Sequence, residues 1–185
     1  KHLPMDRTRE LTRNEVRKMI VRPEAWIIEP DAEGDGLLKA WAGHGSTEFP
    51  LPIETHGVFI ENAAFPCEKD FELFLECVKT PDVYRDEEAF RAAHEHFSTA
   101  SESVIPIGLL SPPYDARVLL NGVVTEIYDA PAEYGFGEKD TLFSFSCLGN
   151  EYDAVYYADA GKITLKKGNI VSCVYRLHGV LRESR

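Results

Sequence analysis

The 185-residue chain is poor in cysteine and has no cysteine motif. The few cysteines form no C-x-x-C pair and show no histidine spacing typical of a zinc site. They are too sparse for a disulfide scaffold. We therefore expect buried, reduced thiols that pack as small hydrophobic side chains. The cysteines are Cys67, Cys77, Cys147 and Cys173.

Motifs of the common enzyme classes are also missing. The sequence has no G-x-S-x-G nucleophile motif and no glycine-rich loop of the kind that binds phosphate. No apolar run approaches the roughly 18 residues of a membrane-spanning helix, and no leader-like segment opens the sequence. We expect a cytoplasmic protein without a cofactor and without membrane contact, and the missing motifs favour a non-catalytic role.

Positive charge is scarce. The chain has 31 acidic and 20 basic residues and a net charge of −11. The imbalance is uneven, because residues 1–111 carry 21 acidic and 12 basic side chains. A negative field opposes binding to nucleic acid, which depends on neutralising phosphates. The charge favours a basic protein partner, or serves solubility alone.

Length and composition are those of a globular protein. The chain is 44% hydrophobic and 28% charged, far from the composition of a disordered segment. The length predicts one or two domains. We expect an acidic α+β part at residues 1–111 and a small antiparallel β-barrel at residues 112–185, with one continuous domain as the alternative.

Helices and strands alternate in the predicted N-terminal part. The clearest helix, at residues 68–79, carries Phe71, Phe74, Leu75 and Val78 at helical spacing. A capping-box pattern predicts another helix near the start of the chain. The expected helices are residues 11–21, 68–79 and 86–97. The expected strands are residues 25–29, 37–42 and 58–61.

Residues 116–182 are rich in β-forming side chains and are punctuated by turn residues. The predicted strands are residues 117–128, 142–148, 152–158 and 170–182. In the last of them apolar and polar side chains alternate, which predicts one buried and one wet face. The order of these strands resembles an OB-type barrel at the level of fold. Little sequence is left at residues 158–163 for the helix that such barrels carry there, so a β-sandwich and an SH3-like barrel stay open.

A resemblance to OB-type barrels implies a ligand surface on the second and third strands of the barrel. Aromatic side chains there would stack on unpaired bases, with basic groups beside them. The candidate ligand-binding residues are Tyr152, Tyr156, Tyr157, Lys166, Lys167, Arg176 and Arg182. This predicts a single-stranded nucleic-acid binder, a hypothesis that the net charge disfavours.

A second candidate site lies in the irregular stretch at residues 43–57. Loops of this kind often carry functional groups. The stretch contains His44, Glu48, Glu54 and His56, which are ligand types for zinc or iron. No spacing among them requires a metal. They define the hypothesis of a metal-dependent enzyme.

The function that we expect first is a non-catalytic binding protein that engages another macromolecule, most simply a protein. An acidic inhibitor or immunity-type protein matched to a basic target is one concrete form of it. The metal-dependent enzyme and the nucleic-acid binder are the alternatives. The sequence leaves the oligomeric state open.

Overall fold

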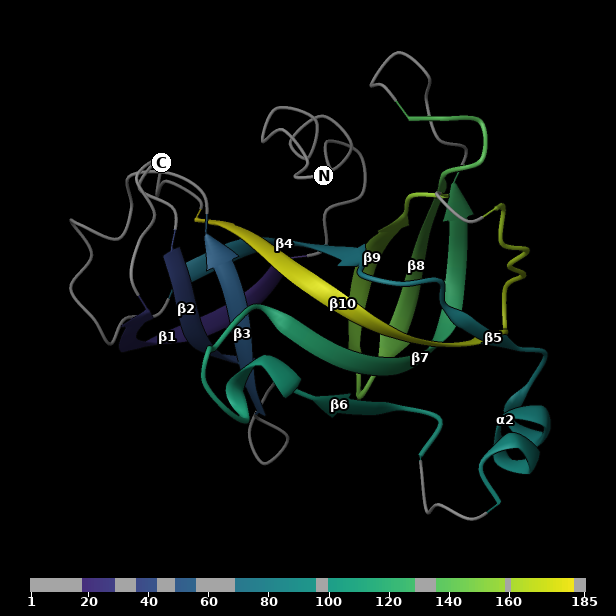
Figure 1. The fold of residues 1–185 in the computed structure, drawn as a ribbon, viewed down its shortest axis with the longest axis horizontal. Coiled ribbons are helices and arrows are strands. Elements are labelled where there is room, and N and C mark those ends of the chain that lie inside the picture. The colour runs from purple at the N-terminus through teal and green to yellow at the C-terminus, as the bar shows by residue number, and fades with distance from the viewer. Residues whose placement is uncertain are drawn as a thin grey trace. The chain divides into compact units, whose positions relative to one another are not determined.

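A computed structural model shows a protein built mainly of β-strands (Figure 1). The residues that it describes are 18–28, 36–42, 49–55, 69–95, 100–128, 136–158 and 161–181. Strands make up 56% of the structure, and within the described residues α2 (Glu87–Ala93) is the only α-helix. The predicted α+β class with two or three helices is therefore wrong. The protein is mostly β and contains a closed five-stranded barrel.

The chain divides into two compact units, each made of separate segments. Unit 1 consists of Lys1–Phe74, Pro106–Arg117 and Leu177–Arg185. Unit 2 consists of Leu75–Ile105 and Val118–Arg176. Each unit thus combines residues from both sides of the predicted boundary between residues 111 and 112.

Unit 1 is built on a meander of three antiparallel strands. These are β1 (Lys18–Ile28), β2 (Gly36–Ala42) and β3 (Phe49–Thr55). β1 also pairs antiparallel with the first part of β4 (Lys69–Cys77), and β3 pairs in parallel with the end of β10 (Ile170–Leu181). The sequence predicted the hairpin of β1 and β2, but the third strand expected at residues 58–61 lies outside the described residues.

Among the described side chains, the apolar ones that are buried on β2 and β3 of unit 1 are aliphatic. Leu38 on β2 and Leu51 and Ile53 on β3 have no exposed surface, and Leu38 is the register partner of Ile53. The Thr55 hydroxyl donates to the Gly36 carbonyl oxygen at 3.0 Å, which ties the far ends of the two strands together. Burial along β3 is nearly continuous, because residues 51–53 and Thr55 are buried and Glu54 between them is half-buried.

Two of the predicted helices are strands. The segment predicted as a helix at residues 68–79 forms β4, in which Leu73, Phe74 and Leu75 are all buried. A strand with successive buried side chains has no wet face, so its apolar residues also match helical spacing. Residues 18–21 of the other predicted helix begin β1, and residues 11–17 lie outside the described residues.

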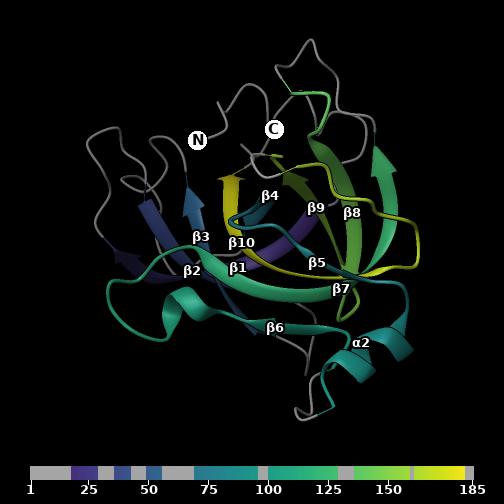
Figure 2. The same ribbon diagram turned by 45° about the vertical axis from the view of Figure 1, so that its right-hand side comes forward.

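Unit 2 contains the closed barrel. The strands of unit 2 are the end of β4, β5 (Asp82–Tyr84), β6 (Ser103–Ile105), β7 (Arg117–Tyr128), β8 (Thr141–Cys147), β9 (Asn150–Tyr156) and most of β10. The barrel is formed by β4, β7, β8, β9 and β10. β7, β8 and β9 form an antiparallel meander, and β8 and β9 lie side by side in both views (Figures 1 and 2). β9 pairs in parallel with β4, and β10 pairs with β4 and β7, which closes the ring. The fifth strand therefore comes from the segment predicted as a helix.

Aromatic rings fill the barrel of unit 2. Phe145 on β8 stacks between Tyr152 and Tyr175, with ring centroids at 5.5 and 5.4 Å. All three rings are buried. Gly122 on β7 leaves room for this stack, because a Cβ atom there would lie 2.5 Å from the Phe145 ring.

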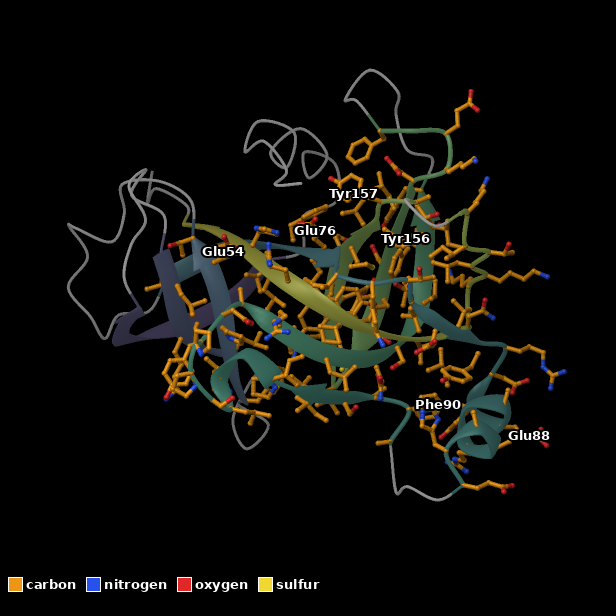
Figure 3. All side chains as sticks on the ribbon, viewed as in Figure 1. Glu54, Glu76, Glu88, Phe90, Tyr156 and Tyr157 are labelled. Carbon is orange, nitrogen blue, oxygen red and sulfur yellow. The ribbon has the colours of Figure 1, made fainter. Side chains whose placement is uncertain are left out.

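The predicted helix at residues 86–97 is confirmed as the shorter α2. Asp86 caps it by accepting a hydrogen bond from the Ala89 N–H at 2.9 Å. Phe90 is fully buried and packs edge-on against Tyr84 with centroids 5.1 Å apart. Figure 3 shows Phe90 turned toward the strands of unit 2 and Glu88 turned away. One apolar anchor therefore holds the helix in place.

Candidate functional site: the outer face of β7, β8 and β9

Side chains of the meander in unit 2 alternate between the barrel interior and an outer face. On β8, Phe143 and Phe145 are buried, and Ser144 and Ser146 point the other way. On β9 the partners of these serines are Asp153 and Glu151. The interior of the meander is thus aromatic, while the outer face is polar.

An irregularity in β7 adds a second polar row. The register with β8 shifts between Val124 and Glu126, as at a β-bulge. Val124 is buried, whereas Thr125 is half-buried and Glu126 is exposed. A bulge places one extra residue along the strand, so Thr125 and Glu126 both reach the outer face.

Hydroxyl groups hold the carboxylates of this face. Thr125 donates to Glu151 with a distance of 2.8 Å between the oxygen atoms. Ser144 donates to Asp153, and the Tyr128 hydroxyl lies 2.9 Å from the Ser144 hydroxyl. Hydrogen bonds to an ionised group are stronger than those between neutral groups. The three strands therefore present carboxylates in defined positions.

The charge of the outer face is of one sign. From Val118 to Tyr156 the three strands contain no lysine and no arginine. Glu126, Glu151 and Asp153 are their acidic residues. Glu151 and Asp153 are two residues apart on one strand, so their Cα atoms are about 7 Å apart. We name the surface formed by Thr125, Glu126, Glu151 and Asp153 the acidic face, and Ser144, which is fully buried, supports it through its bond to Asp153.

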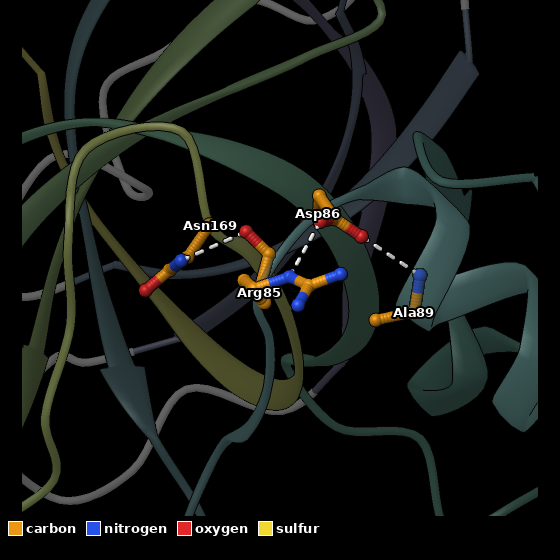
Figure 4. A network of polar contacts seen from close by, with 4 residues as sticks. All are labelled: Arg85, Asp86, Ala89 and Asn169. Carbon is orange, nitrogen blue, oxygen red and sulfur yellow. Dashed lines mark hydrogen bonds and ion pairs between the residues drawn. The ribbon is translucent and has the colours of Figure 1, made fainter.

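Asn169, which directly precedes β10, is the centre of a small polar network (Figure 4). The side chain of this residue, which is 9% exposed, accepts from the Lys166 N–H at 2.8 Å and donates to the Arg85 carbonyl oxygen at 3.0 Å. The Arg85 side chain is 80% exposed and pairs with Asp86. The hydrogen bond from the Ala89 N–H lowers the pKa of Asp86 below its usual value, and the hydrogen bond from the Arg85 side chain adds a smaller effect in the same direction. Lys166 and Lys167 are exposed next to this hub.

The predicted ligand-binding residues do not form one surface. Tyr152 and Tyr156 are only 2% and 4% exposed, and Tyr156 bonds to Thr80 inside unit 2 with 3.1 Å between the hydroxyl oxygens. Tyr157 follows Tyr156 in the chain (both labelled in Figure 3), is half-buried and stacks on Phe136. Buried rings offer no surface for stacking on a base, so the nucleic-acid hypothesis gains no support from them.

The basic members of that set are spread over different segments. Lys166 and Lys167 are exposed before β10, and Arg176 is half-buried within β10. Arg182 lies outside the described residues. The ligand-binding role of these side chains stays a prediction.

Most of the predicted metal site cannot be located. His44, Glu48 and His56 lie outside the described residues. Glu54 is half-buried on β3 in unit 1 and has a partner of its own. Within the part of the chain that the structure describes, no three His, Cys, Asp or Glu side chains are grouped so that they could hold a metal ion.

The thiols of unit 2 are buried, as the sequence predicted. Cys77, Cys147 and Cys173 lie inside the unit, while Cys67 is outside the described residues. Burial raises the pKa of the Cys147 thiol to about 12. A hydrogen bond with Cys77 lowers the pKa of Cys173, and burial raises that of Cys77. A protonated thiol is a poor nucleophile, so Cys147 offers no reactive group at neutral pH.

Comparison with known proteins returns no relative of this chain. No family model, no curated protein and no solved structure matches it. Among the helices of the described residues, none has the length and hydropathy needed to cross a membrane. The acidic face therefore has to be interpreted from its own chemistry.

The sequence analysis considered only aromatic and basic side chains for a ligand surface on these strands. It chose the aromatic residues of β9, which face inward, and passed over Glu151 and Asp153 between them. The signal was available: Ser144 and Ser146 alternate with phenylalanines, so their cross-strand partners had to share the outer face. No comparable sequence pattern predicts the bulge at Thr125.

Proposed function

We propose that this chain is a non-catalytic binding protein whose acidic face engages a basic surface of another protein. The single observation that carries the proposal is the outer face of β7, β8 and β9, on which hydroxyl donors hold two carboxylates and whose strand residues from Val118 to Tyr156 include no lysine or arginine. Complementary charge across an interface speeds association and selects partners.

The chemistry of the face supports binding rather than catalysis. Its residues are carboxylates and hydroxyls, and the described part of the chain places no histidine among them. Ser144 donates its proton to a carboxylate and is fully buried. A serine in that position lacks the exposure that nucleophilic catalysis needs. An inhibitor of a basic enzyme is one form that such a binder takes.

The partner that fits is a lysine- or arginine-bearing strand or loop. Carboxylates about 7 Å apart on β9 match cations on alternate residues of an extended segment. Arginine also has the planar fork that bonds a carboxylate through two N–H groups. Affinity for such a partner falls with added salt, because exposed charges are screened.

The test compares two variants with the same change of net charge. Glu126→Gln combined with Glu151→Gln removes two of the three carboxylates of the acidic face, and Glu88→Gln combined with Glu95→Gln removes the same charge from exposed residues that lie elsewhere in unit 2. The probe is a fluorescent peptide of alternating lysine and threonine, followed by anisotropy. We expect about tenfold weaker binding for the first variant and less than about twofold for the second. Equal losses in both would show that only the net charge matters, and would refute the acidic face as the site.

A further inference from the structure

The segment between β9 and β10, residues 161–167, has the side-chain pattern of a strand without being one. It is the yellow-green trace that leads into β10 in Figure 1. Lys162, Thr164 and Lys166 are exposed, whereas Ile163 and Leu165 between them are half-buried. Alternation with a period of two is typical of extended backbone that rests one side on the protein.

The backbone of residues 162–165 has no hydrogen-bond partner among the described residues. A row of unpaired backbone groups is a template to which another strand can add. The end of the segment is fixed, because Lys166 is bonded to Asn169 and the Gly168 N–H donates to the Val124 carbonyl oxygen at 2.8 Å.

The charge of the segment is opposite to that of the whole chain. Residues 161–169 contain Lys162, Lys166 and Lys167 and no acidic side chain, in a protein of net charge −11. No ion pair joins these lysines to any described residue. The exposed cations therefore remain available to a partner.

We propose that residues 161–167 form a docking strand for an extended acidic segment of a partner protein. The partner adds its backbone along the unpaired groups of residues 162–165 and places carboxylates opposite Lys162 and Lys166. Main-chain bonds supply affinity in this mode, and the side chains select the partner. This proposal concerns a different segment from the acidic face and does not depend on it.

Charge complementarity favours an acidic segment over two other occupants, which are a second copy of this chain and a single-stranded nucleic acid. A second copy of the same segment would set lysine against lysine, which is the usual protection of an exposed edge against self-pairing. Single-stranded nucleic acid needs exposed rings for stacking, and none of the aromatic side chains whose exposure the structure describes is exposed. Of the three occupants, only an acidic strand can pair with the lysine side chains and also form hydrogen bonds with the backbone of the segment.

The experiment uses the full chain and a fluorescent peptide of alternating glutamate and threonine. Lys162→Glu combined with Lys166→Glu reverses the charge, and Lys79→Glu combined with Lys139→Glu is the matched control at exposed lysines of unit 2. We expect at least about tenfold weaker binding for the first and less than about twofold weaker for the second. Circular dichroism verifies that each variant is folded.

A second pair of variants separates strand addition from charge. Thr164→Pro removes one backbone donor, and Thr164→Ala keeps it. We expect the proline variant to bind about fivefold more weakly than the alanine variant, which is the effect of one hydrogen bond. Peptide binding should also slow amide exchange at residues 162–165 in the unchanged protein, a readout that survives if the proline variant misfolds.

Several results would overturn the proposal. One is no binding of the glutamate peptide at low salt, and another is unchanged amide exchange at residues 162–165 when the peptide is bound. Tighter binding of a polythymidine strand than of the peptide would assign the surface to nucleic acid. Self-association that sedimentation detects in the unchanged protein and not in the Lys162→Glu and Lys166→Glu variant would make a second copy the occupant.

Discussion

Unit 1 and unit 2 are built on the same order of strands, but their interiors differ. In each unit a meander of three antiparallel strands ends in a strand that pairs in parallel with a long strand, β3 with β10 and β9 with β4. Along the chain each meander is followed by a long strand, β4 and β10 respectively. The chain thus repeats one pattern that its sequence does not reveal, because strand pairing constrains periodicity more than residue identity.

The buried side chains of the two units show that the shared order of strands does not determine the composition of the core. Unit 1 buries Leu38, Leu51 and Ile53, which have no polar atoms to satisfy. Unit 2 buries Phe145 between Tyr152 and Tyr175, and the hydroxyl groups of these two tyrosines have no hydrogen-bond partner among the described residues. Aromatic rings bury more area per residue, but a buried hydroxyl without a partner costs free energy. The same topology therefore tolerates quite different cores.

The largest expected effect breaks the aromatic core. Phe145→Ala should lower the free energy of unfolding by about 3–5 kcal/mol, because it removes a fully buried ring and leaves a cavity. The matched change in unit 1 is Leu51→Ala, expected to cost about 2–5 kcal/mol. Denaturant unfolding combined with amide exchange measures both. If each variant lowers the protection of amides from exchange only in its own unit, the two cores are independent. A uniform loss of protection in both units would show that they are not.

A smaller effect is expected from the glycine that serves the aromatic stack. Gly122→Ala places a Cβ atom against the Ser146 carbonyl oxygen and 2.5 Å from the Phe145 ring. We expect a loss of about 1–3 kcal/mol, as for overpacking in other cores. Gly137→Ala is the control, since its nearest neighbour lies at 3.6 Å. Thermal unfolding of the two variants measures this difference. Equal stability would show that the Phe145 ring can move to make room for the added Cβ atom.

The smallest effect has the opposite sign. Tyr175→Phe removes a hydroxyl that is buried without a partner, so we expect unchanged stability or a gain of up to about 1 kcal/mol. Tyr156→Phe is the control, because its hydroxyl bonds to Thr80, and it should lose about 1 kcal/mol. A clear loss of stability in Tyr175→Phe, measured by denaturant unfolding, would contradict the idea that the aromatic core carries an unsatisfied group.

The strands of the second meander could be predicted from the sequence because their patterns are local. Alternation of Phe143 and Phe145 with serines marks β8, and Cys173 and Tyr175 alternate in the same way on β10. The helix at α2 was recognisable from its apolar stripe, which includes the buried Phe90. In each case neighbouring residues alone produce the signal.

The failures have one cause, which is burial decided by distant segments. Leu73, Phe74 and Leu75 are buried in succession on β4, and such a run has no strand period from which a strand could be predicted. The alternation along residues 170–182 predicts a wet face that includes His178, but this side chain is only 5% exposed. The candidate site suffered similarly, because aromatic residues were taken for surface before their inward direction was known.

The sequence by itself determined the sign of the charge, the positions of β7 to β10 and the alternation that separates an aromatic interior from a polar exterior. These properties depend on composition and on residues one or two positions apart. Only the tertiary structure decided that β4 is a strand, that it closes the barrel of unit 2, and that Thr125 and Ser144 hold Glu151 and Asp153 in place. Those outcomes depend on which strands pair across long stretches of chain, and pairing energy comes from contacts that no local pattern contains.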